Sequence, residues 1–150
     1  MIFRKAVRED LPAIIKMLTT DNFGAAKDIA TDPLPALYYE AFDNISRNPM
    51  QELIVAEDEN GEVVGTLQLT FIQYVAHQGG IRALVEHVRV REDKRGQRIG
   101  EKMFQWVIER SREKGAYLVQ LTSDKRRKDA IRFYERLGFK DSHAGMKLVL

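Results

Sequence analysis

The chain has 150 residues, a formal net charge of +2 at pH 7, 44% hydrophobic residues, three histidines and no cysteine. This length and composition predict one globular domain over residues 1–150 with a substantial core. Without cysteine there are no disulfides, no thiolate metal ligands and no cysteine nucleophile, and the histidines lack the helical spacing of a zinc site, so we expect no metal. The near-neutral charge argues against a nucleic-acid partner. No membrane span or signal pattern is present, so we expect a cytoplasmic protein.

The first half of the chain predicts two helices around the start of a sheet. Residues 1–7 have a strand pattern, and Glu9-Asp10-Leu11-Pro12 predicts a helix start with an acidic N-cap and proline in the first turn. A loop follows at 21–35, and the apolar spacing at 37–45 favours a second helix.

Three antiparallel strands are predicted next. Their ranges are 52–57, 62–74 and 81–90. The first two are joined by a hairpin turn at Asn60-Gly61, where Asn-Gly supplies positive φ angles. A turn at 77–80 joins the second and third, and Gly65 inside the second strand suggests a bulge or a close approach.

The segment 88–100 predicts a phosphate-binding connection. Its strand leads through a charged turn with Gly96 and Gly100 into an amphipathic helix that begins near Ile99. Unpaired N–H groups and the dipole at a helix N-terminus attract anions, and glycines allow a ligand to approach the main chain. The alternative is an ordinary strand-turn-helix connection with solvated charges. Nucleotide-triphosphatase and dinucleotide loops are excluded by the glycine spacing.

The last third of the chain predicts a parallel strand and a further helix. Lys114-Gly115 ends the preceding helix, and 116–121 is a short apolar strand that a right-handed crossover makes parallel to 81–90. Thr122-Ser123-Asp124 could cap a helix that ends at Gly138. Closing strands are expected at 139–142 and 146–150, around a turn at Gly145. The predicted fold class is therefore α/β (α+β), with a mixed, mostly antiparallel central sheet flanked by helices.

Two motifs resemble those of the GNAT superfamily of acyl-CoA-dependent N-acetyltransferases. Arg95-Gly96-Gln97-Arg98-Ile99-Gly100 is similar to the family's pyrophosphate loop, Gln/Arg-x-x-Gly-x-Gly/Ala, although Arg98 stands where the first glycine usually falls. Residues 129–139 resemble the closing segment Ala-x-x-Phe-Tyr-Glu-x-Leu-Gly-Phe. Their order implies a GNAT fold whose parallel strand pair surrounds a coenzyme cleft.

The resemblance implies direct transfer of an acetyl group from acetyl-CoA to a primary amine. It implies that the acyl-bearing arm of the coenzyme hydrogen-bonds the main chain of the strand before the loop, and that the Val88 N–H donates to the thioester carbonyl oxygen. Arg127 stands where the family often has an asparagine that contacts the coenzyme. The coenzyme-binding residues expected in this way are Val88, Arg89, Val90, Arg95, Gly96, Gln97, Arg98, Ile99, Gly100, Arg127 and Phe133.

Two side chains are candidates for proton transfer. An alkylammonium titrates near ~10.4 and must lose a proton before it attacks, and Glu86 is the candidate general base. Glu86 could instead be a surface carboxylate or an anchor for the substrate ammonium. Tyr134 matches the family tyrosine that protonates the leaving thiolate, or it is a packed tyrosine with its hydroxyl on the backbone. In a regular strand the side chain of His87 would point to the opposite face of the sheet from that of Glu86, but a bulge at this place could change which of the two faces the cleft.

Some features remain open at the level of sequence. The basic run at 125–128 is a solvated helix start or a contact for the coenzyme's 3′-phosphate. Acceptor walls are expected at 23–42, including Phe23, at 68–74 and at Gly79-Gly80. The alternative function is a noncatalytic acyl-CoA-binding module. Many relatives dimerise, so a homodimer is also open.

Overall fold

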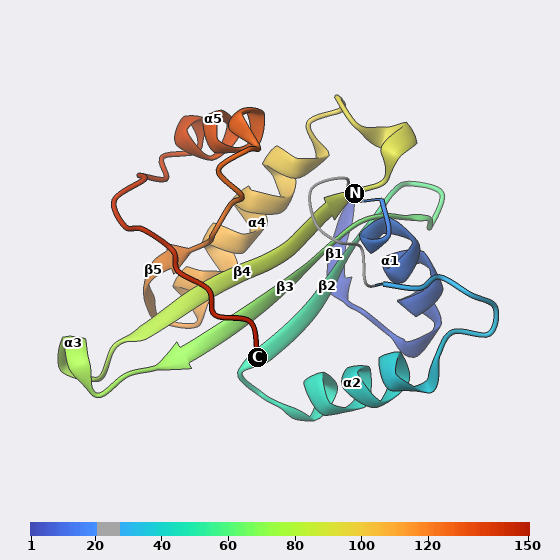
Figure 1. Ribbon diagram of the computed structural model, residues 1–150, viewed down its shortest axis with the longest axis horizontal. Helices are drawn as coiled ribbons and strands as arrows, with labels where there is room; N and C mark the ends of the chain where they lie inside the picture. The colour runs from blue at the N-terminus through green and yellow to red at the C-terminus, as the bar shows by residue number, and fades with distance from the viewer. Residues whose placement is uncertain (21–27) are drawn as a thin grey trace.

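The computed structural model describes residues 1–20 and 28–150, and within them the strands form a five-stranded sheet in the order β1-β2-β3-β4-β5 (Figure 1). The strands are β1 (Ile2–Lys5), β2 (Gln51–Glu57), β3 (Val63–Gln73), β4 (Ile81–Val90) and β5 (Ala116–Gln120). The first four pair antiparallel, and β4 and β5 pair parallel. The mixed fold predicted from the sequence is confirmed.

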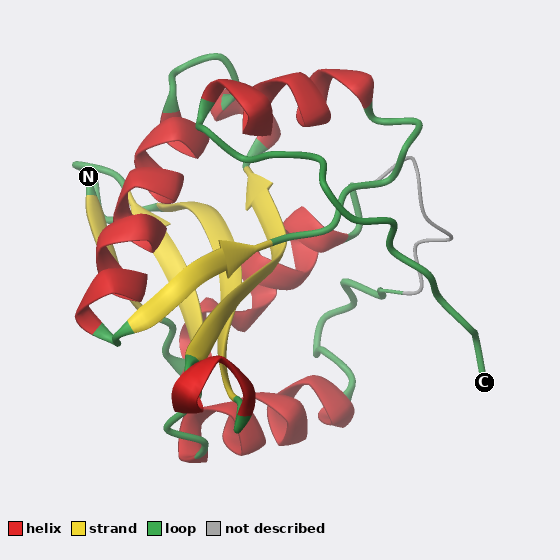
Figure 2. Ribbon diagram, turned by 90° about the vertical axis from the view of Figure 1, so that its left-hand side faces the viewer, coloured by secondary structure: helices red, strands yellow, loops and turns green. Residues whose placement is uncertain are grey.

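Helices lie on both faces of this sheet (Figure 2). The helical segments are η1 (Arg8–Asp10), α1 (Leu11–Leu18), α2 (Ala36–Arg47), α3 (Ala76–Gly79), η2 (Glu92–Lys94), α4 (Ile99–Glu113) and α5 (Lys128–Arg136). The larger core cluster joins α4 to the sheet through buried side chains such as Met103, Phe104, Leu67 and Leu69. Leu11 and Ile15 of α1 form a second cluster with residues of α2 and β2. No helix among the described residues is long and apolar enough to cross a membrane.

The most important irregularity of the sheet is a bulge in β4. Gln68 pairs with Glu86 and Thr66 pairs with Arg89, so Leu67 alone opposes two residues, His87 and Val88. His87 takes a left-handed conformation with φ 53°. An extra residue shifts the alternation of side chains by one position.

The bulge therefore changes which residues of β4 face the core. Before it, Ala83 and Val85 are buried in the α4 cluster, and after it Val88 and Val90 pack against the same cluster. Glu86 and Arg89 consequently face the opposite side of the sheet, the side covered by α1 and α2.

β4 and β5 separate part of the way along the sheet. Their parallel register ends with Leu84 opposite Gln120, where β5 stops, whereas β4 continues to Val90. Arg91 N–H donates to the Val64 carbonyl at 2.8 Å. Because alternate residues of an antiparallel strand bond to the same neighbour, the backbone groups of Val90 point away from β3, toward the side that β5 has left.

A buried ion pair connects β2 to α4. Glu52 is 2% exposed, and it accepts hydrogen bonds from Arg110 at 2.6 and 3.0 Å. Lys5 and Lys114 lie 3.7 and 3.9 Å from the same carboxylate. Burial alone would raise the pKa of Glu52, but the hydrogen bonds from Arg110 and the nearby positive charges hold it below its usual value. The group is thus ionised in the folded protein.

Close packing of β3 against α4 explains Gly65. A Cβ at this position would lie 2.9 Å from the Met103 sulfur and 3.2 Å from the Arg89 carbonyl oxygen. The close approach that the sequence suggested is therefore present.

The expected C-terminal strands are absent. The segment 139–150 has no strand, and its apolar residues Met146 and Leu148 are 93% and 87% exposed. A strand needs a paired neighbour, and β-propensity alone does not supply one. The prediction of closing strands at 139–142 and 146–150 was wrong for this reason.

Two smaller expectations also need correction. Asp124 does not cap α5, because it bonds the Arg126 N–H at 2.9 Å in a turn and the helix begins only at Lys128. Asp10 precedes α1, but its carboxylate makes no cap bond to that helix and accepts instead from the Val7 N–H and from Arg4. In both cases a closer donor competes for the short acidic side chain.

Candidate active site

A cavity of about 590 Å³ lies between the loop after β4 and helix α5. The side chains that line it come from the end of β4, the loop, the first turn of α4 and the last turns of α5. They are Val90, Lys94, Arg95, Gly96, Arg98, Ile99, Gly100, Glu101, Phe133, Arg136 and Leu137.

The loop before α4 contains two residues in the left-handed conformation. Gly96 has φ 79° and Arg98 has φ 58°, so Arg98 keeps the left-handed conformation usual for the glycine that it replaces. The first helical bond of α4 runs from Lys102 N–H to the Arg98 carbonyl. The amides of Ile99, Gly100 and Glu101 therefore have no partner inside the helix and lie at its positive end.

The cavity has an excess of positive charge. Four basic side chains and one carboxylate, that of Glu101, line it. Lys94 is already paired with Asp58 at 3.3 Å, and Arg98 approaches Glu101 at 4.0 Å. Arg95 and Arg136 add two further cations. A diphosphate fits this combination of guanidinium groups and helix N-terminal amides.

Gly100 keeps the cavity open beside Phe133. A Cβ at Gly100 would lie 3.5 Å from the Phe133 ring, an ordinary contact distance. The fold alone therefore does not demand glycine here. A side chain here would project from the first turn of α4 into the cavity, so glycine leaves the amides of that turn accessible to an anion.

The open edge of β4 lies next to this cavity. Arg89 donates from Nη1 to the Val88 carbonyl at 2.9 Å, so its guanidinium sits at that edge. Val90 both lines the cavity and turns its backbone groups toward the side that β5 has left. An extended ligand could thus bond to β4 as an added strand.

Glu86 lies on the opposite face of β4 from the α4 core. It is exposed and stands opposite Gln68 on β3. The bulge brings Arg89 to this same face, so one carboxylate and one guanidinium flank the bulged residue His87. Glu86 is therefore accessible to a ligand on the α1 and α2 side of the sheet.

Tyr134 belongs to an aromatic cluster that packs α5 onto α4. Its ring centroid lies 5.3 Å from Phe104 and 5.4 Å from Phe133. Burial raises the pKa of Tyr134, while the positive charges of Arg127 and Arg89 oppose that rise. The phenol is thus protonated at neutral pH and close to two cations.

The structure brings most of the predicted site together. Of the expected coenzyme-binding residues, Val90, Arg95, Gly96, Arg98, Ile99, Gly100 and Phe133 line the cavity. Gln97 belongs to the same loop, Val88 and Arg89 lie on the open edge, and Arg127 caps α5 beside Tyr134.

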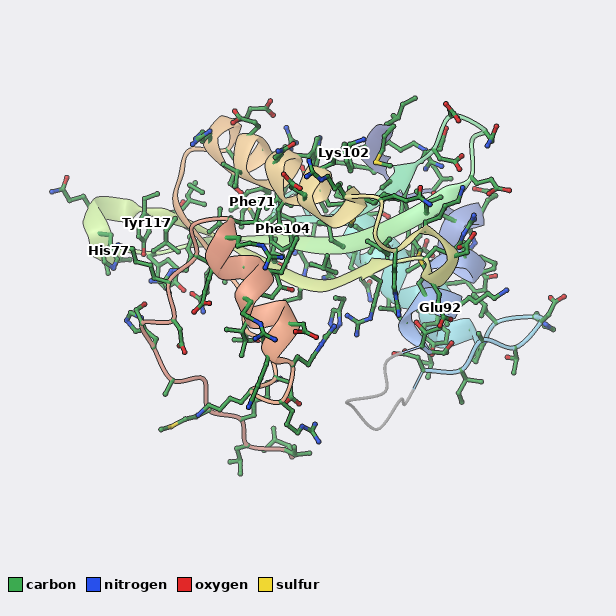
Figure 3. The ribbon with its side chains drawn as sticks, turned by 90° about the horizontal axis from the view of Figure 1, so that it is seen from above. Phe71, His77, Glu92, Lys102, Phe104 and Tyr117 are labelled. Atoms are coloured by element: carbon green, nitrogen blue, oxygen red, sulfur yellow. The ribbon has the colours of Figure 1, made fainter. Side chains whose placement is uncertain are left out.

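Two of the segments expected to line the acceptor site do not lie beside this cavity within the described residues. Phe23 lies outside the described residues. The turn at Gly79-Gly80 lies at the far end of β4: Figure 3 shows His77 and Tyr117 at one end of the molecule and Glu92 at the other. That turn is not beside the cavity.

Four residues of the cavity were not predicted. They are Lys94, Glu101, Arg136 and Leu137. For Arg136 a signal was present, because it follows Phe133 by three positions and shares its helical face. Among the described residues, no group of three or more histidine, aspartate or glutamate side chains could hold a metal ion.

The chain belongs to the acetyltransferase (GNAT) family, whose model matches residues 12–139. It is therefore an acyltransferase, and members of this family use acetyl-CoA as co-substrate.

Two curated relatives are named N-acetyltransferases or acetyltransferases of small molecules. The chain is 39% identical over 84 residues to an aminoalkylphosphonate N-acetyltransferase of Salmonella typhimurium, a match that covers 56% of this chain and 54% of that protein. It is 30% identical over 141 residues to an L-methionine sulfoximine/L-methionine sulfone acetyltransferase of Pseudomonas aeruginosa, covering 93% and 80% of the two chains. The first match thus spans only about half the length of that relative.

A solved structure matches almost the whole chain. The crystal structure of a transcriptional regulator from Bacillus halodurans C-125 is 45% identical and covers 99% of both chains with a TM-score of 0.94. The arrangement of elements described above is therefore shared with an experimentally determined relative.

Proposed function

We propose that this protein transfers an acetyl group from acetyl-CoA directly to the primary amine of a small molecule. The observation that carries the proposal is the basic cavity at the N-terminus of α4, which adjoins the unpaired edge of β4. Diphosphate and an extended acyl-bearing arm are the two chemical features that this combination accommodates.

The donor would be held at two places. Arg95, Arg136 and the amides of the first turn of α4 bind the diphosphate. The acyl arm lies along Val88 and Val90, where backbone groups of β4 have no strand partner on the β5 side. A thioester carbonyl at the Val88 N–H would find a donor for its developing negative charge.

The proton transfers fall to groups on either side of this edge. Glu86 takes the proton of the acceptor ammonium, directly or through a water, and the free amine attacks the thioester carbon. The carbon–sulfur bond then breaks, Tyr134 gives its proton to the departing thiolate, and the attacking nitrogen releases its second proton to solvent. The cations Arg89 and Arg127 stabilise the phenolate left behind, which a proton from solvent restores.

A thermal-shift titration with acetyl-CoA, compared with adenosine diphosphate, tests the donor site. A ligand at a hundred times its dissociation constant adds ~2.7 kcal/mol of stability, and for this size raises the melting temperature by roughly 3–6 °C. Gly100→Glu should abolish the rise, because its carboxylate enters the phosphate site. Gly145→Ala is a matched control, since a Cβ there meets only Thr122 at 3.7 Å. The absence of a rise at millimolar acetyl-CoA would contradict the proposal.

Two variants distinguish a catalytic protein from one that only binds the coenzyme. Glu86→Gln and Tyr134→Phe should slow thiol release in the presence of an amine by 10²-fold or more, while the thermal shift with acetyl-CoA persists. Unchanged low turnover in all three proteins would favour the alternative, a noncatalytic acyl-CoA-binding module.

A further inference from the structure

We infer that the acceptor is an amine that also carries an acidic group, a phosphonate or a carboxylate, and that Arg89 binds this group. The inference rests on the proposed function and assigns the substrate class of the same site. It follows from the juxtaposition of Glu86 and Arg89 that the bulge in β4 creates.

The bulge places opposite charges on one ligand-facing surface. In a regular strand, residues 86 and 89 would point to opposite faces. Here Glu86 pairs with Gln68 and Arg89 pairs with Thr66, two β3 residues of the same face. The carboxylate and the guanidinium therefore lie on the same side of β4, on either side of His87.

The chemistry of this pair matches a zwitterion. Glu86 attracts the ammonium that must be deprotonated, and the guanidinium of Arg89 offers a planar fork of donors that suits carboxylate and phosphonate oxygens. One of its donors, on Nη1, bonds the Val88 carbonyl at 2.9 Å and fixes the guanidinium at the edge where the thioester would lie. An acid bound there holds the amine close to the acyl carbon.

The diphosphate of the coenzyme has its own cations elsewhere. Arg95, Arg98 and Arg136 line the cavity beyond the end of β4, and Arg89 is not among the cavity residues. Arg89 is therefore better placed for an anion on the acceptor. The names of the two curated relatives also denote amines of this kind, an aminoalkylphosphonate and amino acids derived from methionine.

The test compares 2-aminoethylphosphonate with propylamine as acceptors in the wild-type protein, in Arg89→Met and in Arg89→Lys. The measured quantity is the ratio of kcat/KM for the two amines within each protein, because any effect on coenzyme binding cancels from it. We expect a wild-type ratio above tenfold, a ratio near one in Arg89→Met and an intermediate ratio in Arg89→Lys, which keeps the charge without the fork.

Arg91→Met is the matched control. Arg91 lies two residues further on and is engaged by Asp93 at 2.7 Å and Glu62 at 2.9 Å, so the wild-type ratio should persist. A wild-type ratio near one, with propylamine acetylated, would overturn the inference and leave the proposed function standing. So would a ratio unaltered in Arg89→Met. Failure to acetylate either amine, together with no thermal shift by acetyl-CoA, would overturn the proposed function itself.

Discussion

Arg98 shows how the loop tolerates a residue that the family pattern does not have. Its φ of 58° is in the left-handed region, which costs a side-chain-bearing residue roughly 1–2 kcal/mol. Its side chain is largely exposed and lies beside Glu101. The loop thus keeps a left-handed residue before α4 at an energetic cost, and the guanidinium is added to the cavity.

This cost can be measured with two substitutions that both remove the charge. We expect Arg98→Gly to be more stable than Arg98→Ala by about 0.5–1 kcal/mol, because the relief of roughly 1–2 kcal/mol of strain exceeds the ~0.4–1 kcal/mol entropy cost of glycine. Urea unfolding of the two variants gives the difference. Equal stability would mean that the loop relaxes out of the left-handed conformation.

Tyr134 should impose a pH dependence on stability in the alkaline range. Burial raises its pKa in the folded state, against the opposing charges of Arg127 and Arg89, so the folded protein holds this proton more tightly than the unfolded chain. Its contribution is complete below the unfolded value of about 10 and declines as the pH rises through the folded value. The free energy of unfolding should therefore fall more steeply between pH 9 and 11 in the wild type than in Tyr134→Phe. Parallel pH profiles would contradict this.

At the residue scale, the sequence predicted the site where a motif is local and failed where packing decides. The loop residues Arg95 to Gly100 are contiguous, so their pattern alone indicated a phosphate site. Arg136 reaches the same cavity only because Phe133 and Tyr134 pack α5 against Phe104. That contact joins segments about thirty residues apart, so the spacing from Phe133 puts Arg136 on the right face of α5 but does not place α5 beside the loop.

At the scale of elements, β2 and α4 are held together by the ion pair of Glu52 and Arg110. We expect Arg110→Met to lower the free energy of unfolding by about 3 kcal/mol at pH 7, since a buried carboxylate loses its main partner. The value is at the low end of the usual range because Lys5 and Lys114 stay near Glu52.

At acidic pH, Arg110→Met should lose less free energy of unfolding relative to the wild type than it does at pH 7. The folded pKa of Glu52 is lowered, so its stabilising contribution is present above the usual value of 4.5 and disappears as the pH falls through the folded value. Urea unfolding of the wild type and Arg110→Met at pH 7 and pH 3.5 measures whether the difference in their free energies of unfolding becomes smaller at the lower pH. Arg112→Met is the control, because Arg112 pairs with Glu109 on an exposed surface and should leave stability nearly unchanged.

The sequence predicted most elements, and its errors have a common cause. Strands β2 to β5 were evident from apolar patterns and turn residues, and each has a neighbour to pair with. The segment 146–150 has an equally apolar pattern but no partner, and it stays exposed. An apolar pattern shows that a segment has the propensity to form a strand, but whether it does so depends on a sheet edge with which it can pair.

At the scale of the whole molecule, charge is distributed unevenly. The net charge is only +2, yet four basic side chains and one acidic side chain line a single cavity. Overall charge therefore understates the attraction that an anion meets as it approaches this cavity.

Arg136 allows a direct test of this local field. Arg136→Gln should weaken acetyl-CoA binding by about five- to tenfold, since it removes a charge-assisted contact from a partly solvated site, and the remaining affinity should depend less steeply on salt. Arg132→Gln serves as a control, because Arg132 lies on the same helix but pairs with Asp129 at the surface. Isothermal titration at 50 and 300 mM NaCl gives both quantities. Equal losses in the two variants would show that the effect is not local.

The bulge at His87 has a consequence for which changes this gene can accept. Because the bulge absorbs one extra residue and so keeps Val88 and Val90 on the core face, inserting one more residue between Leu84 and Val90 would return the valines to solvent and turn Arg89 inward, whereas loss of the extra residue would leave both faces as they are. Substitutions at His87 leave that count intact. Natural variation in this segment should therefore include exchanges of residues and exclude single insertions, even though its middle is exposed to water.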